Sequence, residues 1–256
     1  MMYKIIKYVL HDIFRNRILL AYVVLLSLSS FGLFLMNDDT SKSLSSLLTV
    51  LLMVVPLVSL LFTTIYFFNS YEFIELLVAQ PLKRSNILMG VYTGVALSML
   101  AAFCIGIGLP VLLFAADTMG LYFMLAGCLL SLVFVSLAFL ASVITRDKTR
   151  GIGIALLLWF YFTIIFDGIM LMVMFAFSEY PLEKLSIILS CLNPIDLARI
   201  LVLLKMDISA LMGYTGAVFQ AFFGSSLGIT LSIGVMILWI LLPLGLSLKI
   251  FKKKNL

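Results

Sequence analysis

Asp167 is the one acidic side chain that lies inside a long apolar run of this sequence. A charged carboxylate facing lipid near the middle of a membrane costs about 2.5–3.5 kcal/mol, so Asp167 is expected to face a bundle interior, a cavity or a subunit seam. There it would line a translocation path, act as a protonatable switch, or, once protonated, hydrogen-bond a neighbouring helix as a packing group. Comparing Asp167→Asn with Asp167→Leu separates these roles, because transport that survives the leucine excludes a role in the path.

The other reactive side chains form no catalytic or metal-binding pattern. Residues 224–228 match GxSxG, the serine nucleophile elbow. That site needs a histidine base, and the only histidine, His11, is predicted on the opposite membrane face, roughly 30 Å away. Cys104, Cys128 and Cys191 show no CxxC or Cys/His spacing, and neither a P-loop nor an HExxH motif occurs. No catalytic or metal-binding residue is therefore assigned, and energy for driven work must come from a partner.

The composition is that of a membrane protein. Of the 256 residues, 64% are hydrophobic and 11% are charged, and the mean hydropathy is +1.23. A soluble domain carries charge on about a quarter of its residues. The net charge of +5 does not indicate a nucleic-acid partner, because in a membrane protein the distribution of charge between the two sides matters more than its sum. The predicted fold is an all-α polytopic membrane protein.

Six charge-poor runs approach or exceed the roughly 20 residues that a spanning helix needs. They are Ile18–Met36, Leu44–Phe68, Ile87–Ala115, Leu121–Thr145, Gly151–Phe177 and Ser225–Leu248. The predicted organisation is an amphipathic elbow helix at 1–17, five spans at 18–177 with a coupling helix at 69–81, an extracytoplasmic loop with short helices at 178–224, and the sixth span with a basic tail at 225–256.

Positive charge is divided unequally between the two sides of these runs. One side has thirteen basic residues: Lys4, Lys7, Arg15, Arg17, Lys83, Arg84, Arg146, Lys148, Arg150, Lys249, Lys252, Lys253 and Lys254. The other side has four: Lys42, Lys184, Arg199 and Lys205. The bias predicts that both termini are cytoplasmic, as an even number of spans requires. A seventh span within the uncharged stretch 208–248 would place the basic tail outside, so 213–224 is predicted to lie at the outer interface.

The polar interruption Asn69–Asn86 predicts a short amphipathic helix on the cytoplasmic side. Asn69 precedes Glu72 by three residues, as in a capping box, and apolar side chains follow at helical spacing. Glu72 and Glu75 lie one turn apart on another face, and Pro81 ends the helix. Such a helix lies flat at a membrane surface, where it either presents a face to a soluble partner or is a plain interfacial loop.

Two further amphipathic helices are predicted outside the spans. Tyr3–Arg17 has basic side chains along one face and apolar side chains along another, which favours an interfacial elbow before the first span. In the outer loop, Asn193 is the predicted N-cap of a helix at about Pro194–Lys205, with Asp196 in its first turn. The apolar face of that helix should pack on the membrane domain or on a partner.

Glycines mark two places where a span approaches another helix or bends. Gly90 and Gly94 form GxxxG, which allows close helix approach. Gly106, Gly108 and Pro110 predict a bend or partial unwinding in the outer part of the third span, and a packing kink is favoured over a substrate site.

These features together resemble the type-2 ABC exporter permeases: six spans, a basic elbow before the first, and an acidic amphipathic helix between the second and third. The string YEFIELLVAQPLKRSNILMG at 71–90 resembles the family's acidic, leucine-rich segment before a proline and a basic pair. Within the family, NPIDLARILVLLKMDISALMGYTGAVFQAFFG at 193–224 and the Asp of FDGIML at 166–171 look most like the NosY-type permeases of nitrous oxide reductase maturation.

The resemblance implies a bacterial cytoplasmic (inner) membrane location and a homodimer with two cytoplasmic ABC ATPases, which bind the ATP and Mg. It also implies a periplasmic accessory protein and a copper chaperone lipoprotein, so that copper is handled at the level of the complex. The residues implied to couple to the ATPase are Glu72, Phe73, Glu75, Leu76, Arg146 and Lys148. Those implied to contact an outer partner are Asn193, Asp196, Arg199 and Tyr214. Asp167 is left as a pathway or interface residue.

Other functions are weighed against this one. The alternatives are a general ABC exporter permease for lipid, peptide or drug, and a non-transporting membrane scaffold. A secondary transporter is disfavoured because Asp167 would be its only intramembrane ionisable side chain. Co-purification of an ATPase separates a permease from a scaffold.

Overall fold

The computed structural model describes residues 2–37, 39–145, 147–176, 183–203 and 226–253, and within these ranges every regular element is a helix. The elements in chain order are α1 (Met2–Phe14), α2 (Arg17–Met36), α3 (Thr40–Asn69), α4 (Tyr71–Val78), α5 (Arg84–Phe103), the π-helical turn η1 (Cys104–Gly108), α6 (Leu109–Phe114), α7 (Thr118–Ile144), α8 (Lys148–Phe160), a second π-helical turn η2 (Tyr161–Ile165), α9 (Phe166–Ala176), α10 (Glu183–Cys191), α11 (Pro194–Leu203) and α13 (Ser226–Lys253).

Six segments of the described chain are long and apolar enough to cross a membrane, which confirms the predicted number of spans. They are α2, α3, α5–η1–α6, α7, α8–η2–α9 and the part of α13 from Gly228 to Lys253. The helix predicted in the outer loop is α11, whereas residues 204–225, which include Tyr214 and the predicted interfacial stretch 213–224, lie outside the described residues.

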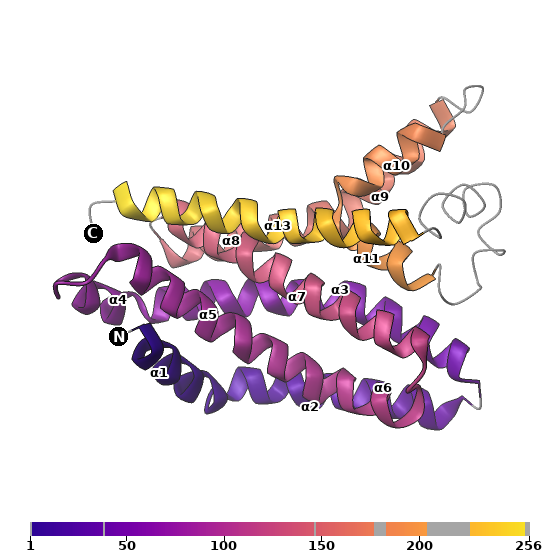
Figure 1. The fold of residues 1–256 in the computed structure, drawn as a ribbon, viewed down its shortest axis with the longest axis horizontal. Helices are drawn as coiled ribbons and strands as arrows, with labels where there is room; N and C mark the ends of the chain where they lie inside the picture. Colours follow the sequence, from indigo (N-terminus) through magenta and orange to yellow (C-terminus); the bar gives the residue numbers. More distant parts are fainter. Residues whose placement is uncertain (1, 38, 146, 177–182, 204–225, 254–256) are drawn as a thin grey trace.

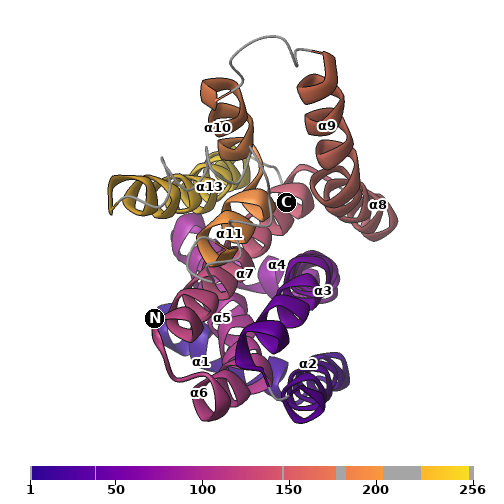
Figure 2. The same cartoon turned by 90° about the vertical axis from the view of Figure 1, so that its right-hand side faces the viewer.

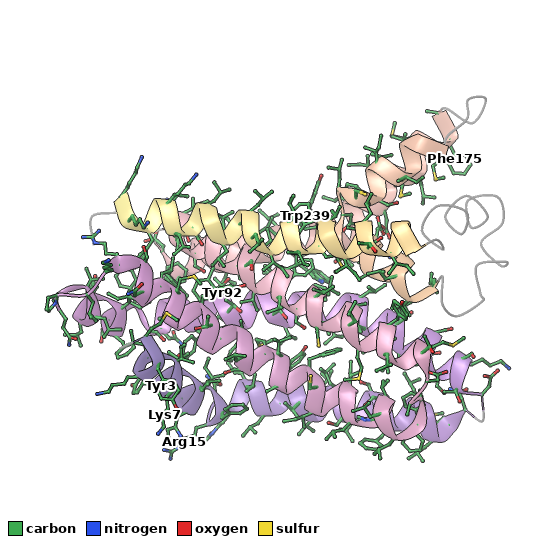
Figure 3. All side chains as sticks on the ribbon, viewed as in Figure 1. Tyr3, Lys7, Arg15, Tyr92, Phe175 and Trp239 are labelled. Carbon is green, nitrogen blue, oxygen red and sulfur yellow. The ribbon has the colours of Figure 1, made fainter. Side chains whose placement is uncertain are left out.

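α7 is the central helix of the bundle. In its most apolar stretch 67% is buried, against 17% for the fifth span and 22% for the sixth. It packs against α3, α5, α11 and α13, whereas α2 and α8–α9 lie at the periphery (Figure 2). The fifth span therefore exposes a broad apolar face, and α9 projects from the bundle as far as Phe175, which is 79% exposed (Figure 3).

The elements next to the two termini lie at the same end of the bundle. Figure 1 shows α1, α4 and the last turns of α13 together at this end, which we call the α4 end, with α6, α10 and α11 at the other. This arrangement agrees with an even number of spans. Which side of the membrane the α4 end faces stays a prediction from the positive charges that flank it.

Packing of α1 on α5 explains the GxxxG sequence of the third span. A Cβ atom at Gly94 would lie 2.5 Å from Val9 Cγ1, and one at Gly90 would lie 3.0 Å from Ile5 Cγ2. The buried stripe of α1 is Ile5, Val9 and Ile13, one residue per turn. The sequence pattern predicts an apolar face that includes Val9, Ile13 and Phe14; the first two are buried, whereas Phe14 is 44% exposed. Tyr3, Lys7 and Arg15 project from the other side of α1 (Figure 3).

Gly94→Ala is expected to lower the stability of the protein by about 1–3 kcal/mol, the usual cost of overpacking, because the added methyl group displaces Val9. Gly32→Ala on α2 is the matched control, since its Cβ would meet nothing within 4 Å. Thermal unfolding of the two variants in detergent measures the difference. An equal melting temperature would contradict the close contact between α1 and α5.

Two spans contain a π-helical turn, η1 in the third and η2 in the fifth. A π turn shifts the backbone hydrogen-bond register by one residue and leaves room for an outside donor. In η1, Ser30 Oγ donates to the carbonyl of Gly106 at 2.9 Å, and in η2, Asn193 Nδ2 donates to the carbonyl of Phe162 at 3.0 Å. The predicted irregularity at residues 106–110 is thus a π turn, whereas η2 has no glycine or proline and was not predicted.

Candidate functional site

α4 is the exposed acidic helix at the α4 end of the bundle. It buries Ile74 and Leu77, and it exposes Glu72, Glu75 and Leu76, the last of which is 67% exposed. We call these three residues the α4 surface. The α4 surface thus presents two carboxylates beside an exposed leucine, on a helix anchored by its opposite face.

The predicted capping box at the start of this helix does not form. Asn69 is the last residue of α3, and Ser70, which occupies the N-cap position of α4, makes no side-chain capping bond. Asn69 Oδ1 instead accepts a hydrogen bond of 2.8 Å from Lys148 Nζ. This bond ties the start of α8 to the base of α4, so Lys148 lies next to the predicted coupling helix, whereas Arg146 is outside the described residues.

α1 also supports α4, through a contact that the sequence pattern did not predict. The rings of Tyr8 and Phe73 are stacked with centroids 4.7 Å apart. Phe73 is therefore only partly available to a partner, and it links α4 to the helix that packs on α5. A force on the α4 surface would reach the third span through Tyr8 and the α1–α5 contact as well as through the chain itself.

The Tyr8–Phe73 stack is expected to contribute about 0.5–1.5 kcal/mol of coupling between α1 and α4. Tyr8→Ala, Phe73→Ala and the double variant form a double-mutant cycle, read from the stability of the protein and from the ATPase rate of the assembled complex. Tyr3→Ala is the control, because Tyr3 is 74% exposed and lies on the same helix. Effects of the two single variants that simply add would contradict the coupling.

A cluster of polar side chains lies where α11 meets the fifth span, toward the end of the bundle opposite α4 (Figure 1). Arg199 donates from Nη2 to Asp167 Oδ2 at 3.2 Å and from Nη1 to Asp196 Oδ1 at 3.1 Å. Asn193 Nδ2 donates to Asp196 Oδ2 at 3.1 Å as well as to the π turn. We call these four residues the α11 cluster; they join the helix of the outer loop to both η2 and α9.

Burial governs the protonation of this cluster. Burial raises the pKa of Asp196 to about 6, and the negative charge of Asp167 also raises it. The Arg199 guanidinium and the hydrogen bond from Asn193 lower this pKa. The side chain of Asp196 is 6% exposed, while those of Asp167 and Arg199 are 35% and 34% exposed. Burial therefore brings the change of charge of Asp196 closer to neutral pH than in an ordinary aspartate.

The structure places several predicted residues differently from the sequence analysis. Asn193 caps α11 as predicted, accepting from the Ile195 N–H at 3.0 Å, but it is fully buried and Asp196 is 4% exposed. Both are covered by the chain itself, so they are assigned to internal structure rather than to contact with an outer partner. Asp167 lies inside the fifth span as predicted, in the first turn of α9, but it is one-third exposed and is paired with Arg199 rather than alone.

A helix bundle of six candidate spans, with an exposed acidic helix at the end where both termini lie, is the architecture of a multi-pass membrane protein. Within the described residues no group of three His, Cys, Asp or Glu side chains is placed to hold a metal ion. The two features that stand out in the described bundle are the α4 surface at one end and the α11 cluster near the other.

Comparison with known proteins places the chain in a family. Residues 3–256 match the ABC-2 family transporter protein model, and the chain belongs to this family. It is 32% identical over 228 residues to the probable ABC transporter permease protein NosY of Pseudomonas aeruginosa, covering 80% of this chain and 82% of the relative. It is 30% identical over 266 residues to the protein of the same name from Stutzerimonas stutzeri, covering 93% and 92%. The chain is the transmembrane permease subunit of an ABC transporter and works with an ATPase partner in a membrane.

Proposed function

We propose that the α4 surface is the site where a separate cytoplasmic ABC ATPase engages this permease. The observation that carries the proposal is the exposure of Glu72, Glu75 and Leu76 on a helix anchored to α1 and adjoining the start of α8. The chain has no P-loop, so ATP and Mg are held by the partner and not by this subunit. The excess of basic residues at this end supports a bacterial inner-membrane protein whose termini and α4 face the cytoplasm.

The working unit is two copies of this chain with two ATPases. The fifth span supports this stoichiometry, because it is the least buried of the six and carries Asp167, which forms a one-third-exposed ion pair with Arg199 of α11. A charged pair facing lipid is costly, and a second copy seated on this face would cover it. Closure of the ATPases on nucleotide would then move the α4 surfaces and rearrange the two bundles.

We further propose that this complex serves nitrous oxide reductase maturation, either by supplying copper or sulfur or by signalling its conformation to a periplasmic accessory protein and a copper chaperone lipoprotein. The resemblance of residues 193–224 to the NosY-type permeases supports this role. A general export role for lipid, peptide or drug is the alternative.

Reconstitution tests these proposals in order. The chain is purified with the candidate ATPase, and ATP hydrolysis is measured with and without the periplasmic protein, copper-loaded chaperone, and a panel of lipids and peptides. Stimulation by the periplasmic protein or chaperone supports the maturation role, whereas stimulation by lipid or peptide alone supports general export. Failure of any ATPase to bind would leave a scaffold and refute the coupling proposal.

A further inference from the structure

The packing of the third span on the fourth brings together two cysteines that are 24 positions apart in the sequence. Cys104 begins η1, and Cys128 lies on α7. Both are free cysteines, and their side chains lie close enough to interact electrostatically. Their spacing in the sequence gave no sign of a site, because each lies in an apolar run on a different helix.

The register that pairs the two cysteines is fixed by the residues just before them. The ring of Phe103 lies so close to Gly127 that a Cβ atom at Gly127 would overlap it. Phe103 is fully buried, so the contact is part of the core. Since Cys104 and Cys128 each follow one partner of this contact, the two thiols are held together by the same packing.

The thioether of Met124 lies near the two cysteines. Met124 lies on α7 one turn before Cys128, on the same face of the helix. A Cβ atom at Gly108 would lie 3.1 Å from Met124 Cε and 3.6 Å from Cys104 Cβ. The missing side chain of Gly108 thus leaves room for Met124 beside η1, and Ser30 fixes η1 from the opposite helix by its bond to Gly106.

We propose that Cys104, Cys128 and Met124 form a binding site for a monovalent soft metal ion, Cu(I). Two thiols and a thioether are soft donors, which favour Cu(I) over the harder divalent ions that prefer carboxylate and water. A structural zinc site would need four ligands, and the described residues group no further His, Cys, Asp or Glu here. All three side chains are partly exposed rather than sealed in the core.

Binding exchanges the metal for thiol protons. Cu(I) replaces the proton of at least one thiol, and that proton passes to the buffer. With one proton lost, the thiolate and Cu(I) cancel in charge, which suits a position within a span. No change of oxidation state is required. The site rests on the ligand chemistry of this chain and extends the proposed function, which named no metal-binding residue in this subunit.

The test is Cu(I) retention by the full-length chain, purified without oxygen in detergent and challenged with a Cu(I)-specific chelator. Wild type is expected to retain one Cu(I) per chain with sulfur-only ligation by X-ray absorption. Cys104→Ser and Cys128→Ser should each weaken retention by at least about 100-fold, and Met124→Leu on the order of tenfold. Cys191→Ser is the matched control, since Cys191 is the last residue of α10 and not part of this site, and it should behave as wild type.

Three outcomes would overturn the site. They are wild-type retention by the Cys104→Ser, Cys128→Ser double variant, no retention by the wild type, and a Cys104–Cys128 disulfide in protein isolated without oxygen. Melting temperatures identify any serine variant that fails to fold, and Cys→Ala variants then replace it. ATPase binding is measured on the same samples. A variant that loses Cu(I) but keeps the ATPase separates this site from the coupling proposal.

Discussion

Reversing both acids of the α4 surface, as Glu72→Lys with Glu75→Lys, is expected to weaken binding of the ATPase subunit on the order of 100-fold. Both carboxylates are exposed, and they are not paired with a basic side chain by any salt bridge found in the described chain. They are therefore free to meet a basic partner surface, and each like-charge contact created by the reversal costs more than 1 kcal/mol. The measurement is co-purification of the ATPase and its affinity for the permease in detergent at two salt concentrations.

Two controls separate electrostatics from damage to the fold. Glu72→Gln with Glu75→Gln removes the charges without creating repulsion, and it should weaken binding less and reduce its salt dependence. Gln80→Lys adds a positive charge at an exposed position in the same loop while both acids remain, and it should change binding little. Normal assembly by the doubly reversed chain, or labelling that places α4 outside the cell, would refute the proposed coupling site.

The prediction of spans and of α4 from the sequence succeeded because both depend on local composition. A run of about 20 apolar residues identifies a span wherever it packs, and an acidic interruption with apolar residues at helical spacing identifies a surface helix. The capping box failed because α3 continues through Asn69, whose side chain is used by Lys148 instead. The local sequence pattern did not show that Lys148, 79 residues away, forms a hydrogen bond with the Asn69 side chain.

The rest could not be predicted because a span is apolar on all sides. The fourth span has no polar face to reveal which of its residues meet the third, so the Cys104–Cys128 contact is invisible in the sequence. The same holds for Asp167, whose partner Arg199 lies 32 residues later in a loop helix. The sequence showed that Asp167 lies within a span, where a charge is unfavourable, but it did not show that Arg199 pairs with it.

Arg199→Met is expected to destabilise the protein by about 2 kcal/mol at pH 7.5. The arginine holds Asp167 and Asp196 together, and its loss leaves two neighbouring carboxylates without a cation. Breaking a fully buried pair costs about 3–5 kcal/mol, and the one-third exposure of Arg199 reduces this. Arg199→Lys keeps the charge but cannot bond both carboxylates with the same geometry, so its loss of stability should be smaller. Denaturant unfolding in detergent measures both.

The pH dependence distinguishes this electrostatic role from simple packing. Burial raises the pKa of Asp196 to about 6 from an ordinary value of 3.8, so between these values the folded state holds a proton that the unfolded state lacks. The contribution of Asp196 to stability therefore falls as pH rises through this window. Removing Arg199 raises that pKa further, because the guanidinium opposes the rise, so the deficit of Arg199→Met should shrink as pH falls from 8 to 5.

Asp196→Asn tests whether ionisation of Asp196 causes the pH dependence of stability. The amide cannot ionise, so the dependence of stability on pH between about 4 and 6 should largely disappear, while Asn193 retains an oxygen to which it can donate. The double variant Asp196→Asn, Arg199→Met should then lose the same stability at pH 5 and at pH 8. An unchanged pH profile in Asp196→Asn would assign the window to another group, and a deficit in Arg199→Met that is constant with pH would show that the arginine acts by packing alone. Asn193 and Arg199 join α11 to η2 and α9 and both also bond to Asp196, so these variants test the charge of the group that lies between those contacts.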